Sequence, residues 1–172
     1  MSANRVRAPL TVALIVATVG NAAALRGQTP AGESARPAPR VVLVCEHGTV
    51  KSLVALEYFT RFAAARGLNV QAISRGTNPD ADVPPIVRNG LAGDGFNIAA
   101  FRPLRFGPGD IDSSLFVVAL DAPVDSIVAR RVPVLRWDGL PSVMADYAGA
   151  RTAISARVQR LVDSLATVKP RP

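Results

Sequence analysis

The residues best suited to chemistry lie close together, between Cys45 and Ser52. This segment holds the chain's single cysteine and its single histidine, His47. It follows the apolar run 41–44 and precedes a stretch with helical spacing, so a strand should end and a helix begin around it. Gly48, the loop amides and the start of the helix can surround an anion with N–H donors. The segment therefore predicts an oxyanion-binding loop with a cysteine at its entrance.

Three side chains of this loop have expected catalytic roles. Cys45 is the candidate nucleophile, because helix N-termini and nearby cations favour the thiolate form of cysteine. Ser52 can donate its hydroxyl to the same sulfur and stabilise it as a leaving group. Lys51, six residues after the cysteine, brings a positive charge toward a bound oxyanion. The alternative is an inert buried cysteine beside ordinary residues of a first helical turn, and the position between strand and helix favours the functional interpretation.

The rest of the loop is expected to contact the anion, mainly through its backbone. His47 is equally compatible with an ordinary exposed loop residue. The candidate phosphate-binding residues are Glu46, His47, Gly48, Thr49, Val50, Lys51 and Ser52. One cysteine and one histidine exclude a Cys-rich zinc site, a multi-histidine metal site and an intrachain disulfide, so we expect no metal and no cofactor.

The elements that must position this loop alternate between strand and helix. Short apolar runs predict strands at 41–44, 70–74, 115–120 and 132–135. Helical spacing predicts helices at 53–66, at 84–91, within 121–131 and at 150–168. Such alternation predicts an α/β fold: a four-stranded parallel sheet with helices on both faces. Ligands of these folds bind at the carboxyl ends of the strands, which is where the Cys45 loop lies.

The N-terminal segment has the pattern of a secretory signal peptide. Arg5 and Arg7 precede the apolar stretch 9–19, and small residues follow it up to Ala24. The apolar stretch is shorter than the ~20 residues that span a bilayer, so cleavage after Ala24 is favoured over a membrane anchor. We therefore expect a signal peptide at 1–24, a flexible linker at 25–39 and a domain at 40–168, located in the periplasm or secreted.

The basic composition favours an anionic substrate over a nucleic acid. The formal net charge is +7, with 20 Lys and Arg against 13 Asp and Glu. The arginines are scattered, and no basic run is interleaved with aromatic residues, as nucleic-acid binding would favour. A mildly basic protein attracts anionic small substrates. The expected partner is a phosphorylated substrate or an oxyanion; the oligomeric state stays open.

The chain resembles the low-molecular-weight protein tyrosine phosphatases and their arsenate-reductase relatives. The first sign is a cysteine, five intervening residues, then a cation and a serine, directly after the first strand. Residues 73–79, 103–118 and 137–147 are similar to later family segments, so the resemblance covers 40–165. It implies a flavodoxin-like three-layer fold and a cysteinyl-phosphate intermediate on Cys45.

Three positions depart from the family pattern. Lys51 stands where the family has arginine, and a lysine lacks the planar fork that holds two phosphate oxygens. His47-Gly48 replaces a Gly-Asn pair. The family's general acid is an Asp before Pro, a dipeptide absent from the late segment here. The resemblance implies Asp138 for that role, with Asp146 second; the alternatives are a solvated carboxylate and, favoured for Asp146, a helix cap.

Three functions follow from these residues. The first is a phosphatase-like hydrolase of phosphate monoesters, with phosphotyrosine implied only by the resemblance. The second is a non-catalytic oxyanion-binding module, which the lysine and the missing Asp-Pro favour. The third is an arsenate reductase that uses an external thiol, because a single cysteine excludes an intrachain relay.

Overall fold

The computed structural model describes residues 38–112, 114–124 and 126–167. The expected signal peptide, 1–24, and all but the last two residues of the expected linker, 25–39, lie outside this range. The described residues cover the expected domain, 40–168, except for positions 113, 125 and 168.

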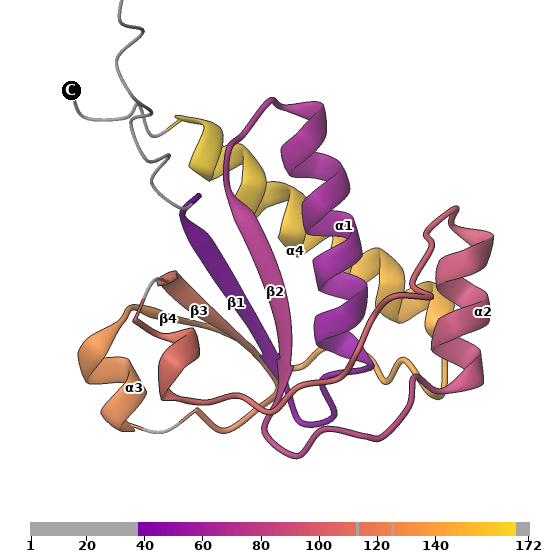
Figure 1. Ribbon diagram of the computed structural model, residues 1–172. Helices are drawn as coiled ribbons and strands as arrows, with labels where there is room; N and C mark the ends of the chain where they lie inside the picture. Colours follow the sequence, from indigo (N-terminus) through magenta and orange to yellow (C-terminus); the bar gives the residue numbers. More distant parts are fainter. Residues whose placement is uncertain (1–37, 113, 125, 168–172) are drawn as a thin grey trace, which may run out of the picture. The chain divides into compact units, whose positions relative to one another are not determined.

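Strands and helices alternate along the domain, as the apolar patterns predict. The elements are β1 (Arg40–Cys45), α1 (Lys51–Ala65), β2 (Gln71–Gly76), α2 (Pro85–Gly93), the short 3-10 helix η1 (Pro108–Asp110), β3 (Ser114–Leu120), α3 (Ser126–Arg131), β4 (Val134–Trp137) and α4 (Tyr147–Thr167). The four strands form one parallel sheet in the order β2-β1-β3-β4. The predicted fold class, a four-stranded parallel sheet with helices on both faces, is confirmed (Figure 1).

The central strand β1 separates two hydrophobic cores. Val41 and Leu43 pack toward α1, α2 and α4, which lie on one side of the sheet. Val42 and Val44 pack toward α3 and the segment before β3, on the other side. All four valine and leucine side chains are fully buried. A strand buried on both faces reads as a continuous apolar run, which explains why 41–44 lacks polar alternation.

The position of β1 in the sheet creates the place for a site. The chain leaves β1 to one side to form β2, and later returns to β1's other side to form β3. The loops that follow β1 and β3 therefore diverge and leave a crevice at the carboxyl end of the strands. Figure 1 shows these loops gathered at the lower end of the sheet.

Most element boundaries differ from the prediction by one to three residues, and two of the differences have a clear physical cause. The last strand begins at Val134 rather than at residue 132, because the Val132 amide donates to the Val128 carbonyl and ends α3 instead. Helix α4 begins at Tyr147 rather than at residue 150. Its start is fixed by Asp146, whose Oδ1 accepts a hydrogen bond from the Gly149 amide at 2.9 Å. The favoured interpretation of Asp146 as a helix cap agrees with this contact.

None of the helices in the described residues combines the length and the apolar character that crossing a membrane requires.

Candidate active site

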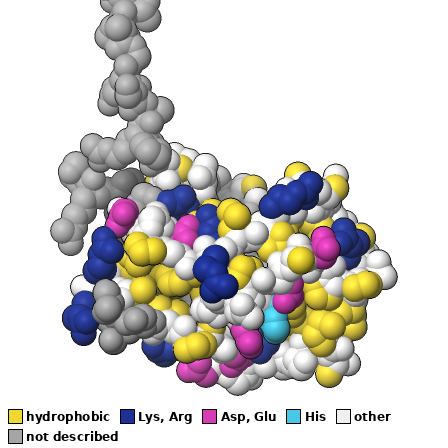
Figure 2. Space-filling view, turned by 60° about the horizontal axis from the view of Figure 1, so that its bottom comes forward, with side chains coloured by type: hydrophobic (Ala, Val, Ile, Leu, Met, Phe, Trp, Pro, Cys, Tyr) yellow, Lys and Arg dark blue, Asp and Glu magenta, His cyan; other side chains and the backbone are white. Residues whose placement is uncertain are grey.

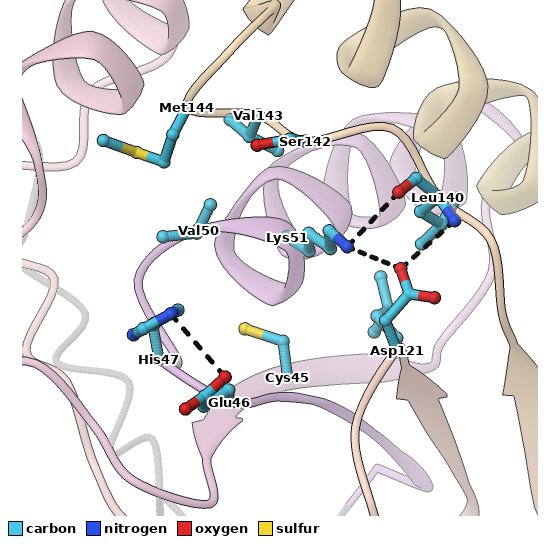
Figure 3. A pocket seen from close by; sticks show the side chains of 11 residues that line it. Cys45, Glu46, His47, Val50, Lys51, Asp121, Leu140, Ser142, Val143 and Met144 are labelled. Atoms are coloured by element: carbon cyan, nitrogen blue, oxygen red, sulfur yellow. Dashed lines mark hydrogen bonds and ion pairs between the residues drawn. The ribbon is translucent and has the colours of Figure 1, made fainter.

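A pocket of about 240 Å³ opens at the carboxyl ends of β1 and β3 (Figure 3). Its walls come from the loop after β1, the first turn of α1, the end of β3 and the late loop, residues 138–146 between β4 and α4. The lining residues are Cys45, Glu46, His47, Val50, Lys51, Leu120, Asp121, Leu140, Ser142, Val143 and Met144. The structure thus brings the predicted nucleophile and the predicted cation into one pocket.

The loop after β1 turns its carbonyl groups away from the pocket. The carbonyls of Cys45, Glu46 and His47 accept hydrogen bonds from the amides of residues 77, 78 and 80, at 3.0, 2.8 and 3.1 Å. The Gly48 carbonyl accepts one from the Ser74 hydroxyl at 2.8 Å. In a trans peptide the N–H points opposite to the C=O. The amides of residues 46–49 therefore point to the other side, where an anion would be surrounded by donors.

Two glycines allow the loop to lie this close to the segment after β2. Gly48 has φ +69°, and a Cβ there would lie 2.8 Å from the Gly76 nitrogen. A Cβ on Gly76 would lie 2.9 Å from the His47 carbonyl carbon. Either distance is shorter than real Cβ contacts, and both neighbours are backbone. The two chain segments therefore pack backbone to backbone only because neither position carries a side chain.

Cys45 is buried at the floor of the pocket and its sulfur is held by two donors. The Gly48 amide donates to Sγ at 3.2 Å, and the Ser52 hydroxyl lies 3.0 Å from Sγ. Ser74 Oγ lies 2.8 Å from Ser52 Oγ and also 2.8 Å from the Gly48 carbonyl oxygen, and its single proton serves one of these two oxygens at a time. When the sulfur is a thiolate it can only accept, so the Ser52 proton points to it. The Ser52 hydroxyl and the Gly48 amide thus stabilise negative charge on sulfur.

The cation of the pocket is paired with a carboxylate. Lys51 Nζ lies 2.5 Å from Asp121 Oδ2 and donates to the Leu140 carbonyl at 3.4 Å. The amides of Gly139 and Leu140 donate to the same carboxylate at 2.7 and 3.1 Å. Burial would raise the pKa of Asp121, but these hydrogen bonds and the Lys51 charge outweigh it and hold the pKa below its ordinary value. Lys51 and Asp121 together fix the late loop over the pocket.

His47 lies at the rim, half-exposed, and its ring is oriented by a second carboxylate. Its Nδ1 lies 3.0 Å from Asp80 Oδ1, and the Thr49 hydroxyl donates to Asp80 Oδ2 at 2.6 Å. Its Nε2 lies 3.9 Å from Glu46 Oε2. Figure 2 views this end of the molecule and shows the histidine, in cyan, at the surface beside acidic side chains. The chain's single imidazole therefore belongs to the pocket.

The predicted site residues take different places. Glu46, His47, Val50 and Lys51 line the pocket with Cys45, whereas Gly48, Thr49 and Ser52 support it from behind through backbone and hydroxyl contacts. Asp138 is exposed and its side chain does not line the pocket; its carbonyl accepts from Arg157. Asp146 caps α4. The acid role of either residue stays a prediction without support from this geometry.

Sequence reasoning missed Asp121 and the apolar residues of the late loop. Asp121 directly follows the buried strand β3 and has φ +47°, which lets it turn its carboxylate toward Lys51. A polar residue at the carboxyl end of a second central strand is a signal that could have found it. Leu140, Val143 and Met144 carry no such signal, because they reach the pocket through an irregular loop. In the described residues, no group of three or more His, Cys, Asp or Glu side chains could hold a metal ion.

Comparisons with solved structures agree with this architecture. The fold matches a thioredoxin-dependent arsenate reductase from Corynebacterium glutamicum with TM-score 0.61 and 22% identity, covering 78% of this chain and 65% of that one. It matches a low molecular weight protein tyrosine phosphatase from Bacillus subtilis with TM-score 0.63 and 18% identity, covering 76% and 99%. It matches an arginine phosphatase from Geobacillus stearothermophilus with TM-score 0.56 and 19% identity, covering 74% and 90%. At these identities the likeness establishes the fold alone.

The sequence comparisons establish the family. No curated protein sequence matches the chain. The sequence profile described as "Low molecular weight phosphotyrosine protein phosphatase" matches residues 40–136, from the start of β1 into β4. That range includes the anion loop, the segment that holds its carbonyls, and Asp121. The resemblance inferred from the loop motif is thus confirmed, and the chain belongs to the low molecular weight phosphotyrosine protein phosphatase family.

Proposed function

We propose that this protein hydrolyses phosphate monoesters through a cysteinyl-phosphate intermediate on Cys45. The observation that carries the proposal is the environment of the sulfur. Sγ lies at the floor of a pocket, 3.2 Å from the Gly48 nitrogen and 3.0 Å from the Ser52 hydroxyl. A thiolate with two donors is both stabilised as a nucleophile and prepared to leave, and double displacement requires both.

The loop supplies the charge stabilisation that phosphoryl transfer needs. The thiolate attacks phosphorus, an S–P bond forms, and the bond to the ester oxygen breaks. Water then attacks the same phosphorus, phosphate forms, and the thiolate is released. The amides of residues 46–49 and the Lys51 ammonium face the equatorial oxygens during both steps. Preorganised donors of this kind act most strongly in a pocket that excludes water.

The pocket walls favour a monoester whose alcohol is apolar. Leu140, Val143 and Met144 are three of the four late-loop residues that line the pocket, and the fourth is Ser142. Phosphotyrosine is one such ester and is the substrate that the family description names. We therefore place aryl phosphates, phosphotyrosine included, first among the candidate substrates.

The experiment is a hydrolysis assay of the purified domain on 4-nitrophenyl phosphate, with Cys45→Ser as the matched control. The expected result is phosphate release by the parent protein and none by the variant. Acid quenching during turnover should also trap one phosphoryl group on Cys45. A parent protein that folds and binds phosphate but shows no turnover and no trapped phosphoenzyme would contradict the proposal.

One observation favours a second candidate, an oxyanion-binding module without turnover. Lys51 is already paired with Asp121 at 2.5 Å, so its charge is partly neutralised before any ligand binds. A site with a neutralised cation can still hold an anion through its amides, because backbone donors remain. Calorimetric titration with phosphate distinguishes this candidate: binding would persist in Cys45→Ser while neither protein turns over.

A third candidate is arsenate reduction, which a chain with a single cysteine can perform only with an external thiol. Cys45 would attack arsenate and displace water as the S–As bond forms. Two equivalents of an external thiol would then be oxidised to a disulfide, which releases the Cys45 thiol as arsenic is reduced to arsenite. Assays with arsenate and glutathione, with and without Cys45, test this route directly. Thiol-dependent arsenite formation exceeding phosphate release would replace the first proposal.

We further propose that the protein is exported and that residues 1–24 are removed. Arg5 and Arg7, the apolar stretch 9–19 and the small residues before Leu25 support this proposal. N-terminal sequencing of protein recovered from the periplasm or medium should begin at Leu25. Recovery of protein with Met1 intact from the membrane fraction would contradict it.

A further inference from the structure

We propose that His47 is the acid–base residue of this site. Its Nε2 would give a proton to the departing ester oxygen and later take one from the attacking water. The inference rests on the proposed phosphate ester hydrolysis and assigns the proton transfers that the hydrolysis requires. It is carried by a juxtaposition: one imidazole lines the same pocket as the nucleophile, and a carboxylate holds its other nitrogen, Nδ1.

The ring is held in one orientation. Asp80 Oδ1 lies 3.0 Å from Nδ1, and Asp80 is itself fixed by the Thr49 hydroxyl at 2.6 Å. The Asp80 amide also donates to the His47 carbonyl at 3.1 Å. A carboxylate at Nδ1 requires a proton there, so the proton that is exchanged must be the one on Nε2. Asp80 is thus a positioning residue for His47.

The second ring nitrogen, Nε2, faces Glu46 at the entrance of the pocket that His47 and Cys45 both line. Figure 3 shows the dashed line from His47 to Glu46 and the Cys45 sulfur on the same side of the ring. The Nε2–Glu46 Oε2 separation of 3.9 Å is too long for a hydrogen bond, so Nε2 can still bond to an oxygen of a substrate or of water. Asp80 and Glu46 are the ionised groups that face this ring, and Lys51 and Asp121 line the opposite wall.

The other acids near the site are less suited to the role. Asp121 accepts hydrogen bonds from Lys51 and two amides, and its pKa lies below the ordinary value, so it holds no proton to give. The Asp138 and Asp146 side chains do not line the pocket. Glu46 lines it, but its side chain is 64% exposed and points to the rim. Histidine is the side chain that ordinarily exchanges a proton near neutral pH.

The two steps balance. In the first, Cys45 thiolate bonds to phosphorus, the P–O bond to the alcohol breaks, and the Nε2 proton of the imidazolium moves to the alcohol oxygen. In the second, neutral Nε2 takes a proton from water as the water oxygen bonds to phosphorus and the S–P bond breaks. The enzyme ends as it began, with a thiolate and an imidazolium, and one water has been consumed.

The decisive experiment compares His47→Asn with the parent protein on two esters. Phenyl phosphate has a poor leaving group that needs a proton, whereas 4-nitrophenyl phosphate has one that departs as an anion. We expect the substitution to lower kcat/KM on phenyl phosphate about 100-fold or more. The loss on 4-nitrophenyl phosphate should be smaller than that by a factor of about ten or more. In His47→Ala, added imidazole should restore part of the phenyl phosphate activity. Equal losses on both esters with no rescue would mean that His47 acts only on structure, and would overturn the inference.

A second measurement reads the ring without turnover. Because His47 is the chain's single histidine, its ¹⁵N resonances in untagged protein need no assignment. At a pH where the ring is neutral we expect the Nδ1–H tautomer, and a shift toward Nε2–H in Asp80→Asn. The opposite tautomer in the parent protein would overturn the inference.

If the parent protein hydrolyses neither ester, the proposed function fails and the acid–base role fails with it. If it hydrolyses both esters but the His47 variants lose activity equally on both, the proposed function holds and the acid–base role of His47 is wrong.

Discussion

In two regions of this domain, an aspartate carboxylate pairs with a cation and accepts further hydrogen bonds. Asp121, at the end of β3, accepts hydrogen bonds from Lys51 and from the amides of Gly139 and Leu140. Asp94, at the end of α2, accepts from the Tyr147 hydroxyl and from Arg151 at 2.7 Å each. Burial would raise the pKa of both carboxyls, yet in both the hydrogen bonds and the neighbouring cation lower it.

The difference lies in what the partners do. Tyr147 and Arg151 belong to α4, and a further partner of Asp94, Tyr58, belongs to α1. That cluster therefore joins three helices, and none of its residues lines the Cys45 pocket. The partner of Asp121 is Lys51, a pocket residue, so the same carboxylate holds the late loop and competes with any bound anion for one cation. An ion pair at a helix junction affects stability, whereas one at the pocket affects stability and ligand binding together.

The largest expected effect is the loss of the pocket cation. Lys51→Met should lower turnover about 100- to 1,000-fold, because it removes one charged donor from the transition state and leaves Asp121 as an unpaired charge. The matched change at the other region, Arg151→Met, should leave turnover per folded molecule unchanged. Steady-state kinetics of both variants on an aryl phosphate provide the measurement. Turnover that survives Lys51→Met would remove Lys51 from the anion site.

Glycine substitutions sharpen the comparison at the level of the backbone. Gly48→Ala should lower the free energy of unfolding by about 2–4 kcal/mol, since its positive φ disfavours a side chain and the new Cβ would meet backbone. Gly90→Ala should lower it by about 1–3 kcal/mol, because the new Cβ would meet the Tyr147 ring, and a ring can shift. Urea unfolding measures both. Phosphate binding should be lost only with Gly48→Ala; its loss with Gly90→Ala instead would reverse the comparison.

The paired carboxylates themselves give the next effect. Asp94→Asn and Asp121→Asn should each lower the free energy of unfolding by about 1–3 kcal/mol, because charged hydrogen bonds are lost. Asp121→Asn should also bind inorganic phosphate more tightly, since Lys51 loses the anion that competes for its charge. Asp94→Asn should bind phosphate as the parent protein does. Calorimetry with phosphate decides, and unchanged affinity in Asp121→Asn would show that the ion pair does not limit anion binding.

The smallest effect is the pH dependence of the same two pairs. A carboxyl with a depressed pKa in the folded state stabilises the protein above its unfolded pKa, near ~3.9, and this contribution is lost as pH falls through the folded pKa. The stability difference between the parent protein and Asp94→Asn should therefore be full near about pH 7 and shrink below about pH 4. Unfolding curves at both pH values test the sign. A difference that grows on acidification would mean that the Asp94 pKa is raised.

The sequence predicted the sheet and the near side of the pocket well, for a physical reason. Strand β1 is a continuous apolar run, and Cys45, Lys51 and Ser52 lie within seven residues of one another, so their proximity follows from local structure. Asp121, in contrast, lies 70 residues after its partner Lys51. Asp80 lies 31 residues after its partner Thr49. Such contacts depend on strand order and loop geometry, which the local pattern does not encode. The late loop has no periodic pattern, so the sequence does not indicate that its apolar residues line the pocket. Asp138 is predicted there only from the family resemblance.

The hydrogen bonds between the anion loop and residues 74–80 also have a consequence for folding. The loop motif is complete within β1 and the start of α1, yet its carbonyls are held by partners in β2 and just beyond it. Those partners arrive only after α1 has crossed over and β2 has paired with β1, a contact of high sequence separation. A peptide spanning residues 38–67 would carry the whole motif and lack the arrangement that orients its amides. Anion affinity therefore reports the docking of β2, and it should appear late in refolding, with the tertiary contacts and not with the first helix.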